Sequence, residues 1–119
     1  MFPFVIRPGY KTKELLIEFR LASGDDEMIL ALKEALAKVN AELVEKLDLW
    51  QNDEIIYRMK SDCGEFDISS NNYGSIFVLA PHNQAAITKI GLALASSPSF
   101  EEVLVVLYGH ELFRGRNFR

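Results

Sequence analysis

The chain has 119 residues, of which 49% are hydrophobic and 25% charged, and its net charge at pH 7 is −4. This length predicts a single domain over residues 1–119, and the composition excludes global disorder. The acidic balance argues against nucleic-acid binding, which needs a basic surface. One cysteine excludes an intrachain disulfide framework.

The chain is expected to be cytoplasmic. Its first residues lack the pattern of a signal peptide, because the basic residues follow the short apolar run instead of preceding it. The longest apolar runs, 76–80 and 103–108, are far shorter than the ~20 residues that cross a bilayer. We therefore expect no membrane association.

The first half predicts one strand and one long helix. Residues 2–6 lie in an N-terminal arm, 1–10, that is an edge strand or an extended lead-in. Residues 14–21 alternate between apolar and polar and predict a half-buried strand. The acidic cluster 23–27 suits a helix start. Apolar residues then recur every three or four positions: Ile29, Leu32, Leu36, Val39 and Leu43. This spacing predicts a helix that ends near Leu47.

The second half predicts four strands and a second helix. The strands are expected at 54–60, 65–69, 75–80 and 103–108. Tight turns at 61–64 and 71–74 make the first three antiparallel neighbours. Pro81 opens the helix, whose inner face carries Ile87, Ile90, Gly91 and Leu94, and residues 96–98 stop it.

The element order is therefore β-α-β-β-β-α-β, with the N-terminal arm as a candidate extra strand. Strands 75–80 and 103–108, which flank the second helix, predict a right-handed parallel crossover. We predict an α+β two-layer sandwich in which two helices cover one face of a mixed, mostly antiparallel sheet.

The opposite sheet face is expected to carry apolar side chains. These residues come from the two strands that flank the second helix: Ile76, Val78, Leu104 and Val106. A bare sheet face would not normally expose such a set. Either the chain's own arm and Phe113 cover this face, which we favour, or a second subunit of a homodimer or another partner covers it.

No catalytic or metal-binding set is found. Cys63 has acidic neighbours in a turn, where no base or positive field activates the thiol. His82 and His110 lack partners at ligand spacing. The acidic pairs 25–26 and 101–102 are typical of a helix start and a strand start. We expect a protein that is not an enzyme and needs no cofactor or metal.

A candidate partner-binding surface surrounds the only tryptophan. Its residues extend from the end of the predicted first helix through the following loop to the start of the next strand: Glu42, Glu45, Asp48, Trp50, Asp53 and Glu54. Trp50 is either a core anchor at the helix end, the commoner role, or a binding hot spot. An acidic surface suits a basic protein partner, although it also favours solubility.

The C-terminal tail, 110–119, contains three arginines interleaved with aromatic residues. Such a tail stacks on single-stranded nucleic acid in some proteins. It is more often a frayed or docking terminus.

Several segments between Gly64 and Phe100 resemble a bacterial immunity-protein family of polymorphic toxin systems. They are Phe66–Ser69, Tyr73-Gly74, Ile76–Val78, Asn83–Ile87 and Ser96–Phe100. Tyr73 stands where the family is expected to have tryptophan, and the N-terminal half shows no match. The resemblance implies a cytoplasmic antitoxin that binds and blocks a cognate toxin without catalysis. The alternative is a small self-associating α+β module with a regulatory or interaction role.

Overall fold

The computed structural model describes residues 2–9, 12–19, 26–71 and 75–103. Two helices and one 3-10 turn are present in this part of the chain: α1 (Asp26–Ala37), α2 (Gln84–Ala95) and η1 (Trp50–Asn52). The strands are β1 (Phe2–Pro8), β2 (Leu15–Phe19), β3 (Glu42–Leu49), β4 (Glu54–Ser61), β5 (Gly64–Asn71), β6 (Ile76–Leu79) and β7 (Phe100–Glu102).

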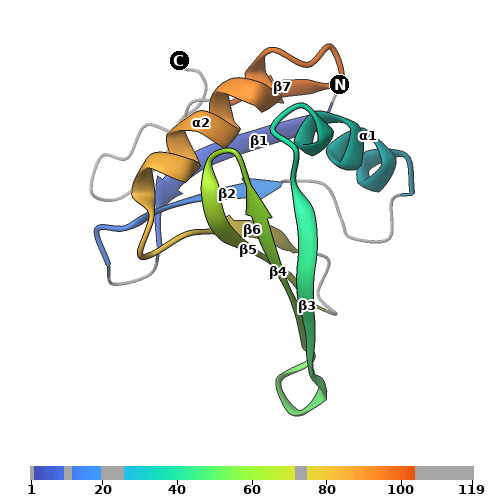
Figure 1. Cartoon of the computed structure of the whole chain (residues 1–119), viewed down its shortest axis with the longest axis vertical. Coiled ribbons are helices and arrows are strands. Elements are labelled where there is room, and N and C mark those ends of the chain that lie inside the picture. Colours follow the sequence, from blue (N-terminus) through green and yellow to red (C-terminus); the bar gives the residue numbers. More distant parts are fainter. Residues whose placement is uncertain (1, 10–11, 20–25, 72–74, 104–119) are drawn as a thin grey trace.

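The strands form one seven-stranded sheet in the order β3-β4-β5-β6-β2-β1-β7. Only the β1–β7 pair is parallel; the other neighbouring strands are antiparallel. Helix α1 connects β2 to the far edge strand β3, and α2 connects β6 to the opposite edge strand β7. Both helices lie on the same face of the sheet (Figure 1). The predicted α+β two-layer sandwich is confirmed.

The predicted length of the first helix is wrong, because α1 ends at Ala37 and residues 42–49 form strand β3. Asn40 has a φ of 55°, and the N–H of Ala41 donates to the Leu36 carbonyl at 3.1 Å. A left-handed residue followed by a bond back to the last turn is a common helix stop. The sequence pattern does not predict β3, because the pairing of β3 with β4 shifts register at Val44 and interrupts the alternation typical of a strand.

The N-terminal arm is neither an edge strand nor a cover for the sheet. It forms β1, which lies inside the sheet between β2 and β7. Strand β7 begins at Phe100, earlier than the predicted 103–108, and residues 104–108 lie outside the described part of the chain. Hydrogen bonds on either side of β7 extend its pairing with β1: Phe2 N–H donates to Ser99 O at 2.8 Å, and Val103 N–H donates to Phe4 O at 2.7 Å.

The core is centred on three phenylalanines beneath α2. Phe4, Phe19 and Phe100 are at most 2% exposed, and their ring centroids are 5.7 to 6.4 Å apart. Two of the three pairs meet edge to face, a favoured arrangement of aromatic rings. These rings come from β1, β2 and β7, so the aromatic cluster joins segments from both ends of the chain to the sheet.

Gly64→Ala is expected to destabilise the fold by about 2 kcal/mol. Gly64 has a φ of +100°, and a Cβ there would lie 2.3 Å from Nδ2 of Asn83. Chemical unfolding would measure the loss. Gly91→Ala is the matched control, because its Cβ would meet only the flexible end of Ile6, at 2.8 Å, and alanine favours the helix. A larger loss for Gly91→Ala than for Gly64→Ala would contradict this account.

Candidate functional site

The β3–β4 hairpin carries all six residues of the predicted partner-binding surface. Its two strands have eight residues each, whereas β6 has four and β2 has five. Figure 1 shows the turn between β3 and β4 at the bottom of the molecule, far from both helices. We refer to residues 48–53 as the hairpin tip.

Trp50 lies at the hairpin tip with 73% of its surface exposed. The core-anchor interpretation of Trp50 is therefore wrong. The short η1 turn starts at Trp50, and Asp53 ends it in the left-handed region with a φ of 54°. The N–H of Asp53 donates to the carbonyl of Trp50 at 3.2 Å, which holds the turn. A large indole thus protrudes from an ordered, hydrogen-bonded tip.

Two of the predicted acidic residues are paired across the hairpin. Glu45 lies 3.5 Å from Arg58, and Glu42 lies 3.9 Å from Lys60. All four side chains are more than half exposed, so each pair contributes little to stability. The pairs nevertheless compensate the negative charge along the body of the hairpin.

Glu54 is a structural residue. It is half-buried, and its carboxylate accepts a short hydrogen bond from the hydroxyl of Ser69 on β5. The two acids that remain exposed beside Trp50 are Asp48 and Asp53, for which no salt bridge is found among the described residues. Of the five predicted acids, only Glu54 is half-buried, and the exposed acids without a salt bridge to a described residue lie at the hairpin tip.

The predicted apolar sheet face is wrong where the structure describes it. Ile76 is 2% exposed and Val78 is fully buried, and both belong to the core beneath the helices. Their neighbours Phe77 and Leu79 face the other side and are half-buried. Alternation along β6 was thus assigned to the wrong face. Leu104 and Val106 lie outside the described residues.

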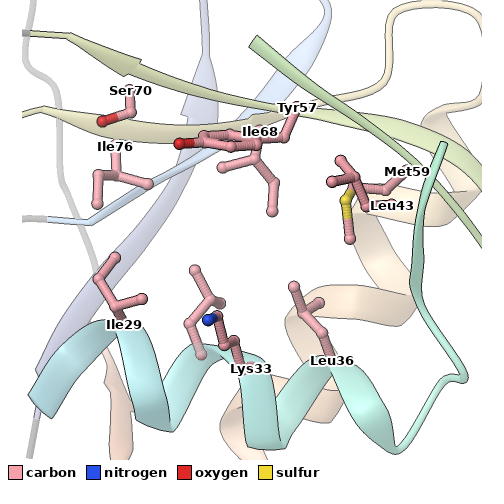
Figure 2. Close-up of a pocket in the computed structure, with 10 residues that line it drawn as sticks. Ile29, Lys33, Leu36, Leu43, Tyr57, Met59, Ile68, Ser70 and Ile76 are labelled. Atoms are coloured by element: carbon pink, nitrogen blue, oxygen red, sulfur yellow. The ribbon is translucent and has the colours of Figure 1, made fainter. Parts of the chain in front are cut away.

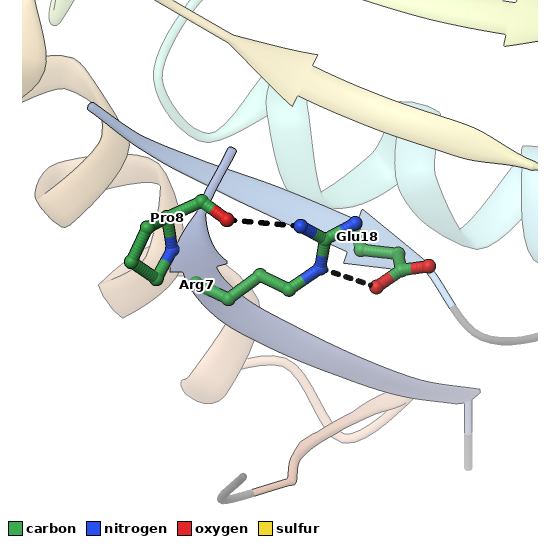
Figure 3. A network of polar contacts seen from close by, with 3 residues as sticks. All are labelled: Arg7, Pro8 and Glu18. Atoms are coloured by element: carbon green, nitrogen blue, oxygen red, sulfur yellow. Dashed lines mark hydrogen bonds and ion pairs between the residues drawn. The ribbon is translucent and has the colours of Figure 1, made fainter. Parts of the chain in front are cut away.

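A polar contact lies on the sheet face opposite the helices. Nε of Arg7 donates to Glu18 at 2.8 Å, and Nη1 donates to the Pro8 carbonyl at 2.9 Å (Figure 3). The guanidinium carbon also lies 5.9 Å from the centre of the Phe77 ring. This face is therefore mixed in character, because an ion pair sits beside its apolar side chains.

Asn83 and Gln84, two residues of the immunity-family resemblance, act as structural ties. Asn83 Nδ2 donates to the Cys63 carbonyl at 2.9 Å and so holds the β4–β5 turn. Gln84 Oε1 accepts from Leu15 N–H at 2.7 Å, and its Nε2 donates to Leu15 O at 3.2 Å. Both side chains connect the start of α2 to the sheet. Their role is therefore structural, and they do not identify a binding surface.

Two reactive side chains, Cys63 and His82, lie among the described residues, and His110 lies outside them. Cys63 is half-buried in the β4–β5 turn, and its N–H donates to the Ser61 hydroxyl at 3.0 Å. His82 is exposed before α2. Within the described ranges, no three His, Cys, Asp or Glu side chains gather closely enough to hold a metal ion. The pairs 25–26 and 101–102 are described in part: Asp26 opens α1, and Glu101 and Glu102 are exposed on β7.

The structure also reveals an apolar groove that the sequence analysis missed. It lies between α1 and strands β3 to β6, and its volume is about 380 Å3 (Figure 2). Ten side chains line this α1 groove: Ile29, Leu32, Lys33, Leu36, Leu43, Tyr57, Met59, Ile68, Ser70 and Ile76. The only sequence signal was the apolar stripe of α1, whose last member, Leu43, belongs to β3 instead and faces the helix across the groove.

The fold and this site together define a small α+β sandwich with a projecting hairpin. No family model matches the chain, and no curated protein or solved structure is significantly similar to it. Neither α1 nor α2, the two helices of the described residues, has the length and apolar character needed to cross a membrane.

Asn83→Ala is expected to cost about 1–2 kcal/mol of unfolding free energy, because it leaves the Cys63 carbonyl without this partner. Denaturant titration would check the value. Combining it with Gly64→Ala provides a second check, since removing the amide also removes the group that the new Cβ would meet. The double variant should lose less than the sum of the single losses. Strict additivity would show that the clash with Asn83 does not determine the cost at Gly64.

Proposed function

We propose that this chain is a non-catalytic protein-binding module that acts as an immunity protein and neutralises a cognate toxin. The observation that carries the binding role is Trp50, 73% exposed at the end of a projecting hairpin. Tryptophan is enriched among the residues that dominate protein interfaces, because its large ring loses much water-exposed apolar surface on binding. The toxin as partner rests on the resemblance of residues 64–100.

The charge of the hairpin tip supports a basic partner. Asp48 and Asp53 flank Trp50, whereas the glutamates farther along the hairpin are matched by Arg58 and Lys60. Uncompensated charge close to the anchor accelerates encounter with an oppositely charged surface. A basic enzyme, such as a nuclease, is the class of toxin that fits this surface.

The exposed edge of β3 is less suited to binding a further strand. Three of its eight residues are acidic, and the register shift at Val44 disrupts the regular ladder. Charged edge residues and bulges hinder edge-to-edge pairing between copies. Self-association therefore has weaker support than binding through the tip, all the more so because Ile76 and Val78 are buried in the core.

Trp50→Ala is expected to weaken binding to the toxin encoded beside this chain's gene by roughly 30-fold or more. Calorimetry with the purified proteins would measure the affinity, and growth of cells that express both proteins would measure protection. Leu92→Ala is the matched control, because Leu92 is a similarly exposed apolar residue, 64% exposed, on α2. The control variant should bind like the unaltered protein.

The outcomes separate the function from the surface. If the unaltered chain neither binds nor protects against that toxin, the immunity proposal is wrong. If it protects but Trp50→Ala protects equally well, the function stands and the hairpin tip is not its interface. A stable dimer in sedimentation that Trp50→Ala dissociates would instead support the self-associating module.

A further inference from the structure

The α1 groove has the properties of a small-molecule site. Its volume of about 380 Å3 falls in the range of ligand pockets, which are mostly apolar with a few polar groups. Seven of its ten lining side chains are aliphatic or methionine, and none is a carboxylate. One of them, Leu43, is 56% exposed, so apolar surface on the β3 side faces water.

The polar groups of the α1 groove favour an anion. Lys33 lines it from α1, and hydroxyl groups of Tyr57 and Ser70 line it from the sheet (Figure 2). A second lysine stands nearby, since Lys46 is the cross-strand partner of Tyr57 and its Nζ lies 5.9 Å from the centre of that ring. Two cations therefore flank a region whose lining has no negative charge.

Lys33 has no carboxylate at helical spacing. The residues three and four positions away along α1 are Leu30, Leu36, Ile29 and Ala37, all apolar. Within the described residues no salt bridge of Lys33 is found. Asp48, the next acid beyond Lys46 on the same face of β3, is opposite Ile55 and belongs to the hairpin tip. Among the described residues, the ammonium of Lys33 thus has no counter-charge at the groove.

We propose that the α1 groove binds a free single-chain carboxylate of the fatty-acid type. The alkyl chain lies against the aliphatic lining, where each buried methylene improves affinity. The carboxylate lies at the mouth beside Lys33, with Lys46 as a second cation. An apolar protein side chain would fill the same space but leave both lysines unneutralised, so charge complementarity favours the carboxylate. This inference does not depend on the proposed function.

The test is calorimetric titration of the lipid-free full chain with octanoate, decanoate and dodecanoate below their micelle concentrations. Affinity should rise by up to roughly fourfold per methylene until the groove is full. Dodecyltrimethylammonium and dodecanol are the matched ligands with reversed and absent charge, and both should bind more weakly than dodecanoate.

Variants locate the site and its charge. Lys33→Met should weaken dodecanoate binding by about threefold, the scale of an exposed ion pair, and leave dodecanol binding unchanged. Lys89→Met, on the exposed side of α2, is the control and should bind like the unaltered protein. Ser70→Phe should abolish binding by filling the groove, with native circular dichroism as the check on folding.

Heteronuclear NMR of the unaltered protein would locate the bound dodecanoate without the use of a variant. Dodecanoate should shift the amide signals of α1 and β4–β5. The proposal is overturned if no carboxylate binds, if the cationic amphiphile binds as well as dodecanoate, or if the shifts lie elsewhere. A dimer detected by sedimentation, with its interface mapped by NMR to the groove residues, would overturn it in favour of a second copy of the chain.

Discussion

The width of the sheet relative to its two helices is the constraint on which this structure depends. Seven strands spaced about 4.8 Å apart span roughly 29 Å. Two packed helices, each about 10 Å across, cover only roughly 20 Å of that width. With α2 placed over the phenylalanine cluster and α1 beside it, the β3–β5 side of the sheet remains partly uncovered.

The α1 groove arises from this mismatch, and the projecting hairpin arises from the greater length of β3 and β4. Where α1 diverges from the sheet, the space between them becomes the α1 groove. Where β3 and β4 extend beyond the helices, the hairpin carries Trp50 into solvent. Their charges differ in sign, since Lys33 and Lys46 flank the groove while Asp48 and Asp53 flank the tryptophan. The two proposals therefore assign ligands of opposite charge to the two features.

The residues of the family resemblance have a structural explanation as well. Asn83 and Gln84 connect α2 to the β4–β5 turn and to β2, and Ser69 holds Glu54 on β4. Gly64 leaves room for the Asn83 amide because glycine has no Cβ. These contacts set the position of α2, which in turn positions the uncovered side of the sheet. Fold and candidate site are thus coupled through a few side-chain amides and hydroxyls.

The sequence by itself determined the parts that depend on neighbouring residues: the alternation of residues 14–19, the 61–64 turn with its glycine, and the stripe of α2. These follow from local periodicity and backbone preference, which a linear pattern records. Tertiary structure contributed to the end of α1 at Ala37, because the N–H of Asp62, in a distant turn, donates to the Val39 carbonyl just beyond the helix. It also decided which face of β6 is buried, the internal position of β1 and the existence of the α1 groove. Each of these depends on which segments meet in space, and contacts between segments far apart in the chain leave no local pattern to read.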